Sequence, residues 1–405
     1  MSRSRRLLFA GLLALFLAAI IISTHFKTPY ALPPGMPLQC GDCDGNGLVD
    51  ILDAYAAARY AVGLYNLAEP EFSACNVTSI RGNQYYPPAN VTTTDALFIA
   101  QHVVGRRRSL NCILDLPILF TSKRDGNWEI YLMDKDGSNE RPFRFSQSDQ
   151  SEEFDPFWSP DGSEIVFVSN RDTGSVAVGS VCEGCELYKI SANAGPSGVP
   201  TRLTNDGFSD YGPSWSPNGE YIAFFSDRIA IAPYRYNVHH LHLASGVITD
   251  LTTPSALVGQ SQPRWNPDGS KIVYKNGRYI YKMDMDGSNK QQLTSTPRCS
   301  DQNPSWTFDG RIAFTRSGQL VFGCPPDTEI FTMQDDGSAQ TRLIGTPGQL
   351  LICGSWTRDG SQILYHGLVI PLSSGYSDVH IVNSFTGSTT PLTNSPSSKN
   401  MTPMQ

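Results

Sequence analysis

The sequence predicts a mainly β protein, a six-bladed β-propeller with a small α-helical module at its N-terminus. Three observations predict it. A tryptophan-containing segment occurs five times at intervals of 41 to 57 residues, an acidic loop with calcium-ligand spacing precedes the repeats, and 35 Gly and 28 Pro indicate many turns. We therefore expect a signal peptide or membrane anchor with a spacer at 1–36, the small module at 37–112 and the propeller at 113–405.

The first region has the features of an export signal. Basic residues in SRSRR come before an unbroken apolar run at 7–23. The run is intermediate in length between a signal-peptide core and a full membrane span, so a cleaved signal and an uncleaved anchor are both open. In either case we expect the rest of the chain to be extracytoplasmic, secreted or membrane-anchored, at the cell surface or in the periplasm.

Cysteine content and charge narrow the class of protein further. Nine cysteines fit an oxidising compartment, and their odd number leaves at least one without a partner in the chain. The net charge is -7, whereas binding to a phosphate backbone needs a basic face, so we expect no nucleic-acid partner.

The loop DCDGNGLVDILD at 42–53 predicts a calcium site. Calcium prefers six to eight hard oxygen ligands in flexible geometry, and the EF-hand loop supplies them at positions 1, 3, 5, 7, 9 and 12, with glycine at position 6. Gly47 occupies position 6 here. The ligand positions hold, in order, Asp42, Asp44, Asn46, Leu48 (through its carbonyl), Asp50 and Asp53.

A short helix ending in Gly63 is expected after this loop, and position 12 is Asp rather than Glu. These features resemble the type I dockerin module, which carries two such repeats. A second repeat is visible at 75–78 and 89–105, but eight inserted residues interrupt its loop, so we expect it to bind calcium weakly or not at all. The resemblance implies attachment to a cohesin-like protein module, often in polysaccharide degradation.

The repeated segments predict four strands in each unit. DPFWSPDGSEIVFVS at 155–169 recurs in variant form at 212–226, 262–276, 303–317 and 353–367. The first strand ends at the Trp, a Pro/Gly turn follows, and the second strand carries Ile-x-Phe/Tyr, which places two large side chains on one face. A third strand, a Gly-containing hairpin turn and a fourth strand ending near Leu-Thr complete the unit.

The two ends of the repeat region predict closure of the ring. Residues 118–143 hold a second, third and fourth strand without a first. The C-terminal NMTPMQ at 400–405 lies in period, with Pro403 at the position of the Pro in PxW. We therefore expect 400–405 to supply the missing strand of the first blade, which leaves no unpaired sheet edge.

This pattern resembles the WD40-like PD40 repeat of TolB-like β-propellers, with the signature PxWSPDGxxIxFxS. The resemblance implies a non-catalytic protein that binds a protein or another ligand at the propeller mouth. Because the fold hosts many functions, the ligand stays open, and a carbohydrate-active enzyme or polysaccharide-degradation component with its site in the mouth is the alternative. A third hypothesis is that the chain is a purely structural surface protein.

Long, irregular loops mark one face of the propeller as the expected binding face. These loops are at 172–185, 228–237, 316–328 and 367–378. The five propeller cysteines are placed in the loops of that face, with Cys182–Cys185 the first expected disulfide and Cys299–Cys324 the second, while Cys353 competes. The CEGC spacing also fits half a zinc site, and His240 with His242 could share a metal, although no further ligand is evident.

Overall fold

The computed structural model describes two units of the chain. The described residues are 77–78, 111–112, 116–143, 151–172, 184–195, 198–229, 236–253, 255, 258–307, 310–318, 328–345, 349–357, 362–369, 377–384, 386–393 and 400–404. In the smaller unit, β1 (Val77–Thr78) pairs antiparallel with β2 (Asn111–Cys112). The expected calcium loop and helices of this unit lie outside the described residues. Within the described part of the chain, no helix has the length and hydropathy to cross a membrane.

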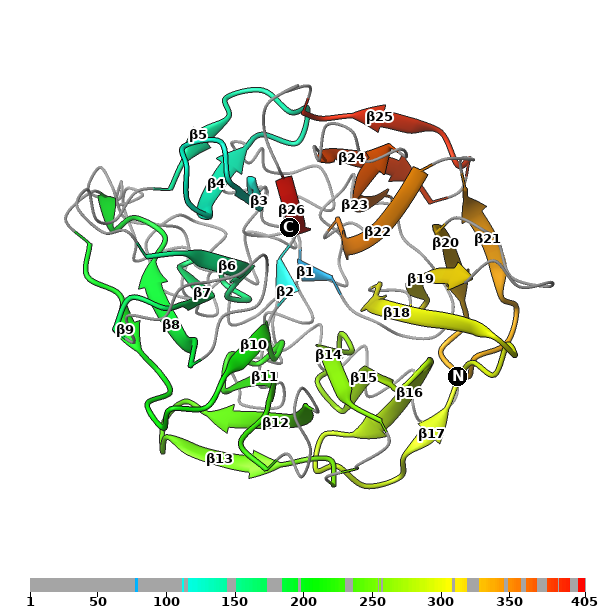
Figure 1. Cartoon of the computed structure of the whole chain (residues 1–405), viewed down its shortest axis with the longest axis horizontal. Coiled ribbons are helices and arrows are strands. Elements are labelled where there is room, and N and C mark those ends of the chain that lie inside the picture. Colours follow the sequence, from blue (N-terminus) through cyan, green and yellow to red (C-terminus); the bar gives the residue numbers. More distant parts are fainter. Residues whose placement is uncertain are drawn as a thin grey trace, which may run out of the picture. The chain divides into compact units, whose positions relative to one another are not determined.

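The larger unit, which contains Leu114–Gln405, is built from six four-stranded antiparallel sheets arranged as blades around a central axis (Figure 1). From the innermost strand outward, blade 1 comprises β26 (Asn400–Met404), β3 (Ile118–Ser122), β4 (Glu129–Met133) and β5 (Arg141–Pro142). Blade 2 comprises β6 (Glu153–Trp158), β7 (Glu164–Ser169), β8 (Glu186–Ser191) and β9 (Thr201–Arg202). Blade 3 comprises β10 (Asp210–Trp215), β11 (Tyr221–Ser226), β12 (Asn237–His242) and β13 (Val247–Asp250).

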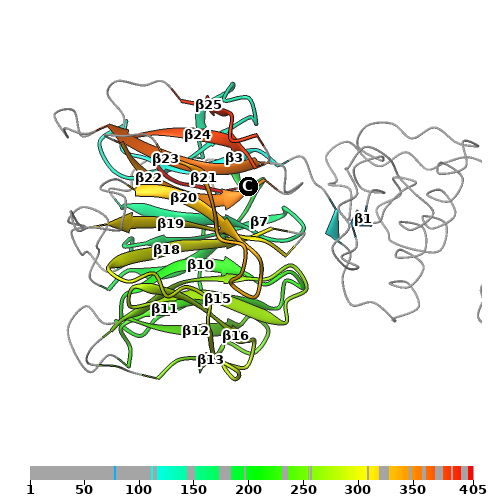
Figure 2. The same ribbon diagram turned by 90° about the vertical axis from the view of Figure 1, so that its right-hand side faces the viewer.

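The remaining three blades repeat this order, and Figure 2 shows the propeller edge-on. Blade 4 comprises β14 (Gln260–Trp265), β15 (Lys271–Asn276), β16 (Tyr279–Asp284) and β17 (Gln291–Gln292). Blade 5 comprises β18 (Cys299–Trp306), β19 (Ile312–Gly318), β20 (Thr328–Met333) and β21 (Thr341–Ile344). Blade 6 comprises β22 (Gln349–Trp356), β23 (Gln362–Val369), β24 (Ser377–Asn383) and β25 (Thr389–Pro391). The six-bladed propeller predicted from the repeats is confirmed.

Closure of the ring by the C-terminus is also confirmed. Strand β26 pairs antiparallel with β3, with Asn400 opposite Ser122 and Met404 opposite Leu119. The first blade is therefore assembled from both ends of the propeller region. This pairing satisfies the backbone groups of β3 that would otherwise form a free edge.

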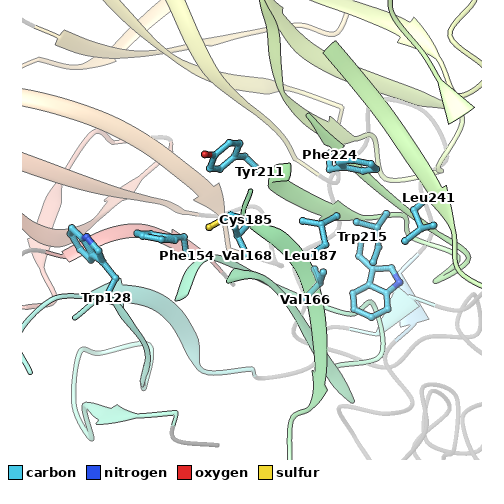
Figure 3. Close-up of a cluster of buried hydrophobic side chains, with 11 residues drawn as sticks. Trp128, Phe154, Val166, Val168, Cys185, Leu187, Tyr211, Trp215, Phe224 and Leu241 are labelled. Carbon is cyan, nitrogen blue, oxygen red and sulfur yellow. The ribbon is translucent and has the colours of Figure 1, made fainter. Parts of the chain in front are cut away.

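The hydrophobic core consists of seams between neighbouring blades. Each predicted Ile-x-Phe/Tyr pair of a second strand lies in one such seam, as Ile165 and Phe167 do between blades 1 and 2. Figure 3 shows the seam between blades 2 and 3, where Trp215 and Phe224 face Val166 and Leu187. The seam between blades 6 and 1 holds Ile118, Phe120, Tyr131, Met133, Leu364, Val379, Ile381 and Leu392.

Polar contacts link each blade to the next. The indole Nε1 of Trp265 donates to the carbonyl of Ser214 at 3.0 Å, and Trp356 does the same to Ser305 at 3.0 Å. The hairpin glycines approach the preceding blade so closely that a Cβ on Gly287 would lie 2.7 Å from the carbonyl oxygen of Leu251. That approach explains why the turn requires glycine, which also has φ +83 there.

The Leu-Thr pairs that follow the fourth strands also have a clear role. The hydroxyl of each threonine accepts a hydrogen bond from the backbone N–H of the second or third residue of the third strand. In blade 3, Val238 donates to Thr252 at 2.9 Å, and in blade 4 Ile280 donates to Thr294 at 3.0 Å. This side-chain hydrogen bond connects the end of the short fourth strand to the third strand, where the backbone ladder between them ends.

Candidate functional site: the propeller channel

The innermost strands carry a bulge at corresponding positions, just before the tryptophan. Their register against the second strand shifts there in every blade. Two sets of equivalent positions result in blades 2 to 6, around the central channel of the propeller. The first ring, three residues before Trp, comprises Asp155, Gly212, Gln262, Asn303 and Cys353. The second ring, directly before Trp, comprises Phe157, Ser214, Arg264, Ser305 and Ser355.

The first ring has an unusual backbone that its own side chains support. Asp155, Gln262 and Asn303 have φ of 47°, 57° and 52°, in the left-handed region. The backbone N–H of Gly212 donates to Asp155 Oδ2 at 3.3 Å, and that of Asn303 donates to Gln262 Oε1 at 2.8 Å. Left-handed conformations in residues other than glycine cost about 1–3 kcal/mol and cluster at functional sites. The strain therefore marks these bulges as candidates for function.

Arg264 of the second ring extends toward the neighbouring blades. Its Nη1 donates to its neighbour's carbonyl, Pro263 O, at 2.9 Å and to Gly212 O of blade 3 at 3.4 Å. Its guanidinium carbon lies 5.6 Å from the centre of the Phe157 ring of blade 2. A side chain of blade 4 thus contacts the next two blades around the axis.

Two further groups act on Arg264 electrostatically. Burial lowers the pKa of Arg264 to about 10, while Asp155 of blade 2 and Cys353 of blade 6 act in the opposite direction. Asp155 and Cys353 therefore lie within electrostatic range of Arg264 although they belong to other blades. Arg264, Asp155, Phe157, Gln262 and Asn303 are each half-buried, so each keeps some solvent-accessible surface. The arrangement can bind and orient a polar ligand.

Cys353 is not suited to act as a nucleophile in this site. The thiol is free and buried, and burial raises its pKa to about 12, although Arg264 acts in the opposite direction. A thiol with that pKa stays protonated at neutral pH, and the thiolate is the reactive form.

Other acidic residues of the innermost strands are occupied by arginines of the same blade. Asp210 accepts from Arg228 at 2.8 Å, and Asp301 accepts from Arg316 at 2.7 Å. In blade 2 the pair is Glu153 with Arg171, at 2.8 Å. Each of these guanidiniums also lies over the phenylalanine of its second strand, at 5.1 to 5.5 Å from the ring centre. These repeated pairs are structural features of the blades.

An acidic cluster near the connection between blades 2 and 3 does not resemble a metal centre. Carboxylate oxygens of Glu186, Asp206 and Asp210 lie within 4.8 Å of one another. Arg202 donates to Glu186 at 3.0 Å, and Arg228 bonds both aspartates. The two guanidiniums supply the positive charge that a cation would bring. Burial raises the pKa of Asp210 to about 6, against the attraction of Arg228.

The expected binding residues fall largely outside the described part of the chain. This holds for the whole predicted calcium set, Asp42, Asp44, Asn46, Leu48, Asp50 and Asp53, and for most of the long loops. The channel residues were missed because each lies at a variable position of the repeat. In the sequence, Arg264 is simply the residue between the Pro and the Trp of its unit, and no pattern marks it.

The cysteines of the propeller are partly as expected. Cys185 and Cys299 are disulfide-bonded, which agrees with an oxidised protein, and their partners lie outside the described residues. The two proposed pairings therefore stay predictions. The placement of Cys353 in a loop was wrong, because it lies within β22, and Cys299 is the first residue of β18. The bulge before Trp356 carries Cys353 into a buried position that the linear spacing did not reveal.

The histidines of β12 pack against aromatic rings. His240 stacks on Trp265 with ring centres 6.4 Å apart and an interplanar angle of 8°, and Tyr221 lies between His240 and His242 at 4.9 Å from each. Among the described residues, no metal-ligand group includes either histidine. The aromatic packing favours the structural interpretation of this pair.

Buried histidines predict that acid destabilises the propeller. Burial lowers the pKa of His366 and of His239 from 6.5 to about 4. Because the folded state resists their protonation, their contribution to stability is complete above pH 6.5 and is lost as the pH falls toward 4. We expect the melting temperature, followed by circular dichroism, to fall over this window and His366→Gln to flatten the decline.

His242→Gln is the control for this measurement because His242 is only partly buried. The raised pKa of Asp210 acts in the opposite direction, since its protonated form is favoured in the folded state, but it is the same in all variants. If His366→Gln and the wild type decline equally between pH 6.5 and 4, burial of His366 does not contribute to acid sensitivity.

Comparisons with known proteins agree with the repeat pattern. A family model described as the TolB β-propeller domain (PD40) matches residues 172–350. An uncharacterised protein of Agrobacterium fabrum is 28% identical over 175 residues, which are 39% of this chain and 53% of that protein. The Tol-Pal system protein TolB of Alcanivorax borkumensis is 24% identical over 177 residues, 42% of this chain and 36% of that protein.

The fold itself is also found in a solved structure. The crystal structure of TolB from Acinetobacter baumannii aligns with a TM-score of 0.55 at 15% identity, covering 79% of this chain and 73% of that one. The propeller is therefore TolB-like in fold, and its residues 172–350 match the PD40 family model. The matched segment spans about half of the first curated relative and about a third of the second.

Proposed function

We propose that this chain is a non-catalytic extracytoplasmic binding and scaffolding protein. Its propeller recognises a protein or carbohydrate ligand, and its dockerin-like module, stabilised by calcium, attaches the chain to a cohesin-like partner module. The observation that carries the proposal is the position of Arg264 on an innermost strand, where its guanidinium contacts the Gly212 carbonyl of blade 3 and the Phe157 ring of blade 2. Because these residues lie on innermost strands of a closed ring, they present fixed polar groups to a ligand.

Two observations support the extracytoplasmic location. The basic start and apolar run at 7–23 have the composition of an export signal. Cys185 and Cys299 are disulfide-bonded, and such bonds persist in oxidising compartments. Treating the purified exported protein with a thiol-reactive probe before and after reduction tests this support. We expect most propeller cysteines to react only after reduction, whereas freely reactive thiols at Cys182, Cys185, Cys299 and Cys324 would oppose it.

The donor set at 42–53 fits calcium, because carboxylate, amide and carbonyl oxygens are the ligands that this ion prefers. We expect calorimetry on the full chain to show one strong calcium site. Asp42→Ala or Asp53→Ala should abolish it and expose 40–105 to proteolysis without melting the propeller. Asp95→Ala, in the interrupted second loop, is the matched control and should leave the strong site unchanged. Two equally tight sites would contradict this interpretation of the insertion.

The binding function and its non-catalytic character are tested together. The full chain is incubated with a panel of polysaccharides and peptides, and both retention and chemical change are measured in the same samples. We expect a ligand to be retained and recovered intact. New reducing or unsaturated ends would show a carbohydrate-active enzyme instead. For the attachment module, binding to cohesin-type modules should be lost when a chelator removes calcium.

A further inference from the structure

We propose that the channel at Arg264 is a binding site for the carboxylate of a small organic monoanion. A carboxylate would then be one chemical group of the ligand that the propeller binds. This proposal rests on the proposed function in one respect, that the channel is a recognition site. The site consists of Arg264 with Phe157 behind it and Asp155 and Gln262 beside it.

The hydrogen-bonding capacity of Arg264 suits a carboxylate. A guanidinium has five N–H donors, and its planar edge matches the two oxygens of a carboxylate. Nη1 is used by Gly212 O and Pro263 O. Within the described part of the chain, Nε and Nη2 have no hydrogen-bond acceptor, and the side chain is only half-buried. The free edge of the guanidinium is therefore within reach of solvent and of a ligand.

The positive charge of Arg264 also favours an anionic ligand. Within the described residues, Arg171, Arg228 and Arg316 each have a carboxylate partner in their own blade, whereas no ion pair involves Arg264. Lys275, one pair further along the same two strands of blade 4, is half-buried and donates only to Gln302 Oε1, at 3.3 Å. Lys275 thus contacts blade 5, and Arg264 differs from the three paired arginines in having no carboxylate partner among the described residues.

The charge of Asp155 favours a monoanion over a dianion as the ligand. Asp155 lies close enough to act on Arg264, so the channel already holds one negative charge. A second negative charge on the ligand would be repelled, because Coulomb interactions are strong where water is partly excluded. A planar monocarboxylate matches both the charge and the geometry better than phosphate does.

The ring of polar residues adds a further donor. Gln262, two residues before Arg264, uses Oε1 to accept from Asn303 N at 2.8 Å. That bond fixes the amide plane and leaves Nε2 without an acceptor among the described residues. The guanidinium carbon of Arg264 lies 5.6 Å from the centre of the Phe157 ring, and this contact restricts the positions that the side chain can adopt.

The test uses the full chain and acetate as the probe, in a chloride buffer at constant ionic strength. We expect saturable acetate binding by ligand-observed NMR and calorimetry, with inorganic phosphate binding more weakly. Arg264→Gln should weaken binding by about tenfold or more, because a charge-assisted bidentate pair is lost. Arg141→Gln, at an exposed arginine of the outer strand β5, is the control and should bind as the wild type does.

Asp155→Asn keeps the proposal testable if Arg264→Gln folds poorly. Asparagine retains an oxygen for Gly212 N and accepts a left-handed backbone, so the bulge should survive. Because the negative charge of Asp155 is removed, acetate binding should become roughly several-fold stronger. Absence of saturable binding, unchanged binding in Arg264→Gln, or tighter phosphate than acetate would each overturn the inference. If the inference fails in one of these ways but the chain still retains a ligand from the polysaccharide and peptide panel, the proposed function is not contradicted.

Discussion

Deletion of 398–405 is expected to lower the melting temperature by about 10 °C or more and to cause aggregation, although the segment has the sequence of a polar tail. The deletion removes β26, the innermost strand of blade 1. It exposes the edge of β3, whose five residues are all buried. Each lost backbone hydrogen bond costs about 1 kcal/mol, and the free strand edge offers a template for association with other chains.

Replacement of Thr389–Pro391 by a Gly/Ser segment is the matched control. This segment is β25, the outermost strand of blade 6, and its residues are exposed. It pairs with only one strand, so its loss leaves the ring closed and should reduce stability much less. Differential scanning calorimetry and light scattering compare the two variants. Equal melting of the truncated and full-length chains would show that β26 does not close the ring.

Arg316→Met is expected to destabilise the propeller by about 3–5 kcal/mol, because it leaves the buried carboxylate of Asp301 without its partner. The Arg316 side chain is 8% exposed and the Asp301 side chain 1%, and the guanidinium bonds the carboxylate at 2.7 and 3.0 Å. The same guanidinium lies 4.6 Å from the centre of the Phe331 ring, so packing is lost as well. Urea unfolding followed by tryptophan fluorescence measures the difference.

Two further variants show whether the effect comes from the buried charge. Removing both charges, with Asp301→Leu in addition to Arg316→Met, should recover much of the loss, since no unpaired ion remains. Arg342→Met breaks a pair with Glu329 at 2.9 Å in which the arginine is 52% exposed, and should cost only about 0–1 kcal/mol. A loss in Arg316→Met no larger than that of Arg342→Met would refute the structural role of the buried pair.

The architecture of the propeller could be predicted from the sequence because its signals are local and repeated. Alternating apolar residues, turn glycines and the Trp spacing each determine a strand or a turn within a few residues, and six such units have one way to bury their faces. Even the closing strand was recognisable, since Pro403 keeps the period of the repeat. The Leu-Thr pairs were visible as a pattern, but their hydrogen bonds to the third strand were not.

The channel site could not be predicted, because it depends on contacts between blades far apart in the sequence. Asp155, Arg264 and Cys353 belong to blades 2, 4 and 6 and come within electrostatic range only when the ring closes. The bulges that place them also override local preference, as the left-handed Gln262 shows. Local sequence therefore determined the strands, turns and number of blades of this protein. The tertiary structure alone decided which variable side chains converge at the axis, because closure of the ring is a long-range packing event.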